Sequence, residues 1–400
     1  MFKNNKLWYS IGAIVIGLLF GILLLFATGQ SISEFGTSIY QSSFNDWISF
    51  GNLLSVVAWI ILISLAFMIS FRARIFNIGA AGQFVAAGLF TYALINQLPI
   101  TGRWAILITL FFPILIGMFF AWLIAFLKTQ FKVHEVLSSI LLNIIIFWLY
   151  IWFISPIHHP AIASELGTVD IASNFSLQFS FWADESFINY GIILAVIALV
   201  IFIFMYKKTT WGYRQKVLGS KNKASYYVGI NLNQEFTKTM IISGALAGLA
   251  GGVFYFGCNQ NLPVLTNALP GEAWFGLAII LVAFNNIFGI IIVAFIFGLL
   301  ENAIVFNAAV GQSVSILNLM VVVLMITSTI FYAFIIYNPQ ELFVCWFKNV
   351  HRKNLYPFRR NHQKDQIKIK NNFSKYFDYI RISKTTYDIK GQEYKKREGK

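Results

Sequence analysis

Residues 209–231 read TTWGYRQKVLGSKNKASYYVGIN, a polar and basic segment between two long apolar runs. Within it, Ala224, Tyr227 and Val228 follow the spacing of one helical face, and Gly229 stands where that helix would end. A loop of this length that is rich in Lys and Arg is expected in water, on the cytoplasmic side of a membrane. The segment therefore predicts a short cytoplasmic helix with one apolar face, which is typical of an element that docks onto a partner.

The composition around this segment is that of a membrane protein. Of the 400 residues, 58% are hydrophobic and only 12% are charged. Apolar runs of about 18 or more residues recur, each long enough to cross a ~30 Å hydrocarbon core as a helix. The first run, Leu7 to Ala27, has no signal-peptide cleavage site after it and is interpreted as a retained helix. The two cysteines form neither a metal motif nor a disulfide framework.

The apolar runs predict about ten transmembrane helices, with both chain ends on one side. Nearly all Lys and Arg residues of the connecting segments then fall on the side of the chain ends, and only Arg103 falls on the other. This positive-inside bias predicts cytoplasmic N and C termini. The predicted fold is thus an all-α polytopic membrane protein, with helices over residues 8–28, 52–71, 76–95, 104–127, 133–154, 187–206, 237–257, 274–284, 288–307 and 316–337. The run 274–284 is too short to span alone unless it extends into 268–273 or belongs to a broken hairpin.

The C-terminal residues 338–400 have a different composition from the rest. They carry 16 Lys and Arg against 6 Asp and Glu and show no sustained apolar period. We expect a basic cytoplasmic tail that is disordered or partly folded, with its cations drawn to the anionic lipids of the membrane. Nucleic-acid binding is the alternative for such a tail, but no nucleic acid is expected as a partner.

Amide side chains interrupt two of the apolar runs. Residues 76–83 read FNIGAAGQ, which places Asn77 and Gln83 in an apolar setting, with two glycines between them that permit close backbone approach. Residues 134–143 read HEVLSSILLN, and Asn143 lies two to three turns into that helix. Amides at such positions either line a pathway or form hydrogen bonds between helices. Glu135, near the boundary, is expected to pair with Lys132 or to cap its helix.

Residues 243–252 read SGALAGLAGG and carry small residues at every fourth position. Gly244, Gly248 and Gly252 define this stripe, which lets two helices pack at close range. The stripe predicts assembly of helices and says nothing of a ligand.

One acid, Glu301, lies far along the predicted helix 288–307, and the sequence shows no second ionisable partner at matching depth. A buried acid is a candidate for proton or sodium coupling, so an ion-coupled secondary transporter is one hypothesis. The chain contains no phosphate-binding loop, zinc motif or nucleophile elbow. We therefore expect no catalytic residue, no metal site and no ATP hydrolysis by this chain alone.

The ordered motifs FNIGAAGQ, HEVLSSILLN, the 209–231 segment, ISGALAGLAGG and GLAIILVAFNNIFGI resemble those of permease subunits of bacterial ABC importers. The family is the one shared by branched-chain amino acid, simple-sugar and nucleoside importers, and FNIGAAGQ looks most like its nucleoside branch. The resemblance covers roughly residues 50–335. It implies a transmembrane permease domain over residues 1–337, a coupling loop over 209–231 and a multi-pass location in the bacterial plasma membrane.

The resemblance also implies partners and roles for individual residues. Such permeases have a cytoplasmic coupling helix, whose pattern falls on Lys223, Ala224, Ser225 and Gly229; Lys and Ser replace the usual acid and second alanine. The implied partners are an ABC ATPase subunit that uses ATP-Mg, a second permease subunit and a substrate-binding lipoprotein. This chain itself would bind no cofactor. It would move nucleosides or related small polar solutes by alternating access through a pathway lined by Asn77, Gln83 and Asn143, with simple sugars as the alternative substrate.

Overall fold

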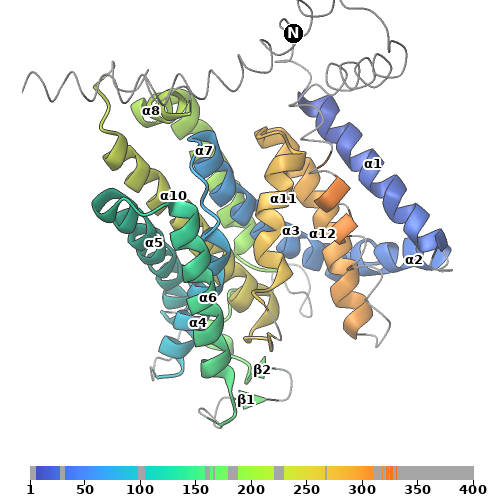
Figure 1. Ribbon diagram of the computed structural model, residues 1–400. Helices are drawn as coiled ribbons and strands as arrows, with labels where there is room; N and C mark the ends of the chain where they lie inside the picture. Colours follow the sequence, from blue (N-terminus) through green and yellow to red (C-terminus); the bar gives the residue numbers. More distant parts are fainter. Residues whose placement is uncertain are drawn as a thin grey trace, which may run out of the picture. The chain divides into compact units, whose positions relative to one another are not determined.

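The computed structural model describes residues 6–27, 32–97, 104–157, 163–164, 167–178, 188–219, 229–265, 268–309, 318, 321–323, 325–327 and 330. These residues form a bundle of helices (Figure 1). The α-helices are α1 Lys6–Ala27, α2 Ile32–Ser43, α3 Trp47–Arg72, α4 Ala80–Ile95, α5 Ala105–Phe131, α6 Glu135–Ile154, α7 Gly191–Lys208, α8 Thr210–Leu218, α10 Leu232–Val253, α11 Phe275–Val282 and α12 Ile287–Ala309. Strand β1 Ala163–Ser164 pairs with β2 Gly167–Thr168 in a small antiparallel hairpin.

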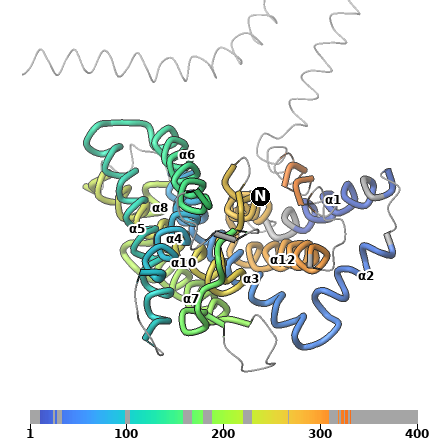
Figure 2. Tube along the Cα trace, turned by 90° about the horizontal axis from the view of Figure 1, so that it is seen from below, coloured from blue at the N-terminus to red at the C-terminus, as the bar shows by residue number. Residues whose placement is uncertain are grey.

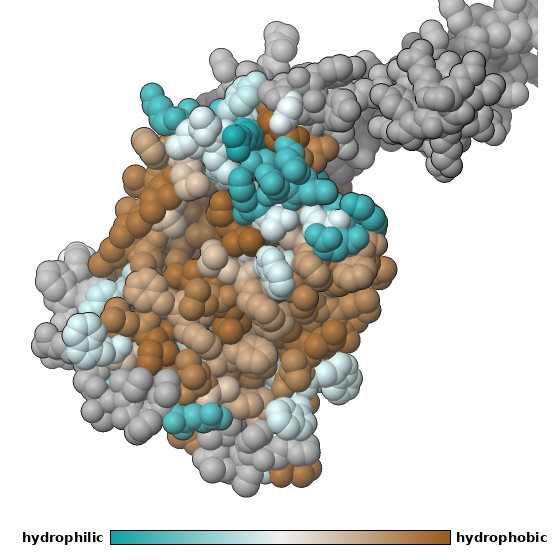
Figure 3. All heavy atoms as spheres, turned by 90° about the vertical axis from the view of Figure 1, so that its left-hand side faces the viewer, coloured by the Kyte–Doolittle hydropathy of each residue, from teal (hydrophilic) through white to brown (hydrophobic). Residues whose placement is uncertain are grey.

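Within the part of the chain that the structure describes, 6 helices are long and apolar enough to cross a membrane: α3, α5, α6, α7, α10 with its continuation to Asn259, and α12. Shorter apolar helices occur at Ile11–Leu23, Ala80–Ile95 and Gly271–Val282. Figure 3 shows hydrophobic residues over most of one face and hydrophilic ones gathered near its top. The prediction of an all-α polytopic membrane protein is confirmed, whereas the number of crossings and the side of the termini stay predictions.

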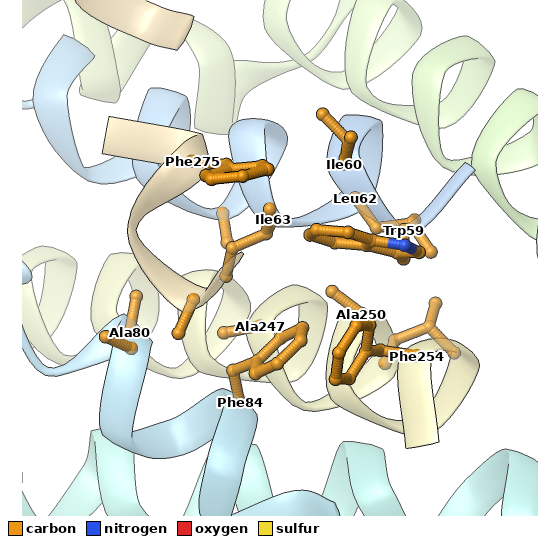
Figure 4. Packing of buried hydrophobic residues seen from close by; sticks show 14 of the residues in the cluster. Trp59, Ile60, Leu62, Ile63, Ala80, Phe84, Ala247, Ala250, Phe254 and Phe275 are labelled. Atoms are coloured by element: carbon orange, nitrogen blue, oxygen red, sulfur yellow. The ribbon is translucent and has the colours of Figure 1, made fainter. Parts of the chain in front are cut away.

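Helix α3 forms the centre of the packing. Its neighbours are α4, α7, α10, α11 and α12, and Figure 2 shows it between α4, α5 and α6 on one side and α1, α2 and α12 on the other. Trp59 of α3 is 1% exposed; its ring stacks on Phe275 at 5.8 Å and meets Phe254 edge-on at 5.1 Å. Figure 4 shows these rings with Phe84 among the buried side chains. Aromatic pairs of this kind contribute about 0.5–1.5 kcal/mol beyond the area that they bury.

The glycine stripe of α10 packs against α5. A Cβ atom on Gly244 or Gly248 would lie under 3.0 Å from a backbone oxygen of α5, that of Gly117 or Pro113 respectively. A Cβ on Gly252 would lie 2.9 Å from Pro113 Cγ. Only residues without a side chain allow the two backbones to approach this closely. The partner surface on α5 was not identified from the sequence.

Several helix bounds differ from the prediction. The sequence predicted a connection over residues 29–51, but α2 occupies Ile32–Ser43 and α3 begins at Trp47. Asp46 caps α3, because its Oδ1 accepts a hydrogen bond from Ser49 N at 2.7 Å. This bond holds the pKa of Asp46 below its usual range. Helix α2 was not predicted, because a mostly polar helix gives no apolar signal of span length.

The 209–231 segment also differs from its prediction. It begins with helix α8, Thr210–Leu218, which was not predicted from the sequence. Thr209 caps this helix, since its Oγ1 accepts from Gly212 N at 3.3 Å. The helix predicted around 224–229 falls on residues 220–228, which lie outside the described residues. The predicted helix 316–337 lies mostly outside them, and the tail 338–400 entirely so.

The short run 274–284 belongs to a broken hairpin. A 3₁₀ turn, Gly271–Trp274, leads into α11, and Phe284 and Asn285 adopt left-handed backbone angles, φ 49° and 55°, before α12 begins. Helix α10 ends differently from the prediction, because a π-helix over Phe254–Asn259 continues it. Such π-helical turns are rare in proteins, and those that do form are frequently found at functional sites.

Candidate functional site

The amides predicted to line a pathway lie together at the start of α4. Asn77 Nδ2 donates to Gln83 Oε1 at 3.3 Å and to Ser243 Oγ of α10 at 2.9 Å. Gln83 Nε2 donates back to Asn77 Oδ1 at 3.4 Å, and Ser243 Oγ donates to Ala66 O of α3 at 2.7 Å. Asn77, Gln83 and Ser243 are all 0% exposed. The network therefore ties α3, α4 and α10 together, and Ser243 was not predicted to belong to it.

Asn143 connects α6 to the same turn. Its Oδ1 accepts from Gly82 N at 3.1 Å, and its Nδ2 donates to Ile78 O at 3.2 Å. One turn earlier in α6, the buried Ser139 Oγ has no hydrogen-bond partner within the described ranges. The three predicted amides thus surround one helix start, where each bonds to groups of the protein in this conformation. That they line a transport pathway stays a prediction.

At the N-terminal end of α10, helix α8 is held by ion pairs and a hydrogen bond. Arg214 Nη1 lies 3.0 Å and Lys238 Nζ 3.3 Å from Glu235 Oε1. Glu235 is only 2% exposed, and burying a carboxylate is costly unless cations accompany it. Thr239 Oγ1 donates to Gln215 Oε1 at 2.8 Å. Helix α8 is therefore attached to the first two turns of α10.

Helix α8 also contacts the end of α3. A Cβ atom on Gly219 would lie under 3.0 Å from Arg72 O. The Arg72 guanidinium lies 4.3 Å from the centre of the Tyr206 ring of α7, and its Nη2 donates to Asn285 O at 2.7 Å. Arg72 thus connects the ends of α3 and α7 with the turn between α11 and α12.

Of the four predicted coupling residues, Gly229 alone is among the described ones. Its φ of +69° is left-handed, which suits a glycine at a helix end, and no atom of the described residues lies within 4 Å of the position that a Cβ would take. Lys223, Ala224 and Ser225 lie outside the described residues, so their coupling role stays a prediction.

The pairing expected for Glu135 is corrected by the structure. Its carboxylate lies 2.7 Å from Lys128 Nζ, one helix earlier in the chain, rather than beside Lys132. Lys132 Nζ instead donates to Thr129 O at 2.9 Å. The left-handed backbone of Lys132, φ 60°, turns the chain between α5 and α6 and points the side chain back along α5.

Glu301 has an ionisable neighbour, contrary to the expectation from the sequence. It is 6% exposed and interacts electrostatically with Glu272 of the 3₁₀ turn before α11. Glu272 lies in the polar connection before α11, outside the apolar runs, so its interaction with Glu301 was not expected from the sequence. The residues that the structure describes include no group of three or more His, Cys, Asp or Glu that could hold a metal ion.

Comparison with known proteins matches residues 49–329 to the family "Branched-chain amino acid transport system / permease component". The chain is 30% identical over 310 residues to the nucleoside ABC transporter permease protein NupB of Lactococcus lactis subsp. cremoris, a match that covers 75% of this chain and 84% of that one. It is 27% identical over 289 residues to the guanosine ABC transporter permease protein NupP of Bacillus subtilis, covering 72% and 82%. No solved structure matches the chain.

Proposed function

Because the chain belongs to the permease component family of branched-chain amino acid transport systems, we propose that it forms the membrane path of an importer for nucleosides or related small polar solutes. It is an ABC transporter permease of the plasma membrane and not an enzyme. The observation that carries the substrate class is the match of 75% of the chain to a nucleoside permease. Simple sugars remain the alternative class.

An importer permease of this family works with an ATPase and a substrate-binding protein. We assign ATP-Mg to the ATPase, a lipoprotein to the binding role, and a second permease subunit to the other half of the membrane path. ATP binding would close the ATPase pair, and the solute would pass as the path opens first outward and then inward.

Helix α8 is the proposed mechanical link between the ATPase and the membrane path. It directly precedes residues 220–229, where the coupling helix is expected, and it is bonded to α10 through Arg214, Gln215, Glu235 and Thr239. A displacement of the coupling segment would therefore move α8 and the start of α10 together. The far end of α10 carries the glycine stripe and the π-helix, so the motion reaches the middle of the bundle.

The amides at the start of α4 are the proposed solute contacts. Asn77, Gln83 and Asn143 can each donate and accept, which suits ribose hydroxyls and base edges. In the described conformation their bonds join α3, α4, α6 and α10. Separation of these helices would release donors and acceptors to a passing solute, and their return would close the path again.

A double-mutant cycle tests the link in proteoliposomes that contain the permease, ATPase and binding protein. Arg214→Gln and Glu235→Gln are each expected to lower ATP-driven nucleoside uptake about threefold or more while the ATPase still turns over. Both variants remove the Arg214–Glu235 ion pair, and Glu235→Gln also removes the pair with Lys238, so the double variant should be no worse than Glu235→Gln alone. Lys207→Gln, an exposed cation at the same end of the bundle, is the control.

Three outcomes would each contradict a part of the proposal. Uptake driven by a proton or sodium gradient without any ATPase would assign the chain to the ion-coupled secondary transporters. Strictly additive effects of Arg214→Gln and Glu235→Gln would show that α8 is not the link. They would not contradict the proposed import of nucleosides. If unlabelled glucose competed for uptake and unlabelled nucleosides did not, the substrate class would be simple sugars instead of nucleosides.

A further inference from the structure

Arg72, the last residue of α3, contacts three other parts of the bundle. The first is the C-terminal part of α7: the guanidinium carbon lies 4.3 Å from the centre of the Tyr206 ring and 5.3 Å from that of Phe202. These two rings are one helical turn apart and stack on each other at 5.7 Å. A guanidinium is attracted to the negative faces of such rings. The end of α3 is therefore held against the end of α7.

The same side chain holds the turn between α11 and α12. Arg72 Nη2 donates to Asn285 O at 2.7 Å, a length typical of a hydrogen bond with a charged donor. Phe284 and Asn285 both have left-handed backbone angles, which are uncommon for residues other than glycine. Surrounding contacts must maintain a turn of this kind, and the bond from Arg72 is one of them.

Helix α8 is the third part of the bundle that contacts Arg72. Its C-cap residue, Gly219, lies so close that a Cβ atom there would be under 3.0 Å from Arg72 O. Lys216 of α8 places its Nζ 5.0 Å from the centre of the Tyr206 ring. Among the residues that the structure describes, no carboxylate forms a salt bridge with Arg72. The ring faces and the Asn285 carbonyl therefore stabilise its charge, and α8, α7 and the α11–α12 turn meet at this one residue.

We propose that Arg72 is a positioning residue that transmits the displacement of α8 to the turn between α11 and α12. The inference rests on the proposed role of α8 as the link to the ATPase. Because Gly219 touches the backbone of Arg72, α8 cannot move toward α3 without moving Arg72. The charged hydrogen bond then carries Asn285 with it. The contacts between α8 and α10 move α10, and Arg72 adds α11 and α12 to the same motion.

The first test measures guanosine uptake and ATP hydrolysis together, in proteoliposomes of the whole complex. Arg72→Gln should lower the guanosine imported per ATP hydrolysed about tenfold while hydrolysis continues, since hydrogen bonds to charged groups are the strong ones. Arg72→Lys keeps the charge but not the flat, forked donor, so it should restore part of this ratio. Arg74→Gln, which removes an exposed cation two residues later, is the matched control and should leave the ratio unchanged.

A distance measurement separates this role from a merely structural one. Spin labels are attached through Tyr213→Cys in α8 and Phe288→Cys in α12, both exposed positions, in a chain whose native cysteines are replaced by alanine. With Arg72 present, ATP should leave the distance between the labels constant, because the two elements move together. With Arg72→Gln, ATP should change this distance, because α8 then moves without the turn.

Two results would overturn the inference: an unchanged ratio of uptake to hydrolysis in Arg72→Gln, or a label distance in that variant that does not respond to ATP. Gly219→Ala perturbs the same contact from the side of α8, and it should also lower the ratio, so the inference stays testable if Arg72→Gln fails to assemble. Absence of ATP-driven nucleoside uptake by the wild-type complex would instead refute the proposed function, which the distance measurement does not require.

Discussion

The contact between α5 and α10 allows a quantitative prediction for Gly248→Ala. The new Cβ would lie under 3.0 Å from Pro113 O, and under 3.4 Å from two further backbone atoms of α5. Relief requires the two helices to separate by about 1 Å, because the obstacle is backbone and cannot rotate away. Overpacking of this kind costs about 1–3 kcal/mol. The Gly248→Ala variant is therefore expected to be less stable than the wild type, because most of the stabilisation from the close contact of α5 and α10 is lost.

The measurement is unfolding of the purified protein by increasing SDS in mixed micelles, followed by tryptophan fluorescence. Gly252→Ala should cost less than Gly248→Ala, since its new Cβ would meet the ring of Pro113 at 2.9 Å rather than a carbonyl oxygen. Gly36→Ala in α2 is the control, because no atom of the described part of the chain lies within 4 Å of its Cβ position, and alanine in a helix gains about 0.5–1 kcal/mol over glycine. Equal stability of Gly248→Ala and wild type would refute the close packing of α5 and α10.

Three further predictions concern the amides, a helix cap and the topology. Asn143→Leu preserves the size of the side chain but leaves Gly82 N and Ile78 O unpaired, and SDS unfolding should show a loss of about 1–3 kcal/mol. Asp46→Ala should lower stability at neutral pH; since the folded-state pKa of Asp46 lies below its usual range, the wild-type advantage should be present above about pH 4 and shrink as pH falls through that lowered value. Cysteines introduced at Ser173 and Ser220 should react with an impermeant thiol reagent from opposite sides of the membrane, and labelling of both from outside would contradict cytoplasmic termini.

The interactions around Glu301 illustrate where sequence reasoning stops. Its depth in an apolar helix was visible from the sequence, and so was the break at Asn285 that makes α11 short. Its interaction with Glu272 was not visible, because that residue lies in a polar connection and its position relative to Glu301 depends on how the chain folds. Similarly, the basic character of residues 209–231 predicted their side of the membrane, whereas the attachment of Arg214 to Glu235 needed the packing of α8 on α10.

The sequence by itself determined that this protein is a helical membrane protein, which family it resembles, and that residues 243–252 form a close-packing stripe. Hydropathy and residue spacing are properties of one helix at a time, so they can be recognised in the sequence without knowing which helices lie next to it. The tertiary structure decided which groups meet: Asn77 donates to Ser243 across a separation of 166 residues, and Asn143 of α6 bonds to Gly82 and Ile78 at the start of α4. Hydrogen-bond partners depend on how helices are rotated against each other, and that rotation is set by side-chain packing over the whole bundle.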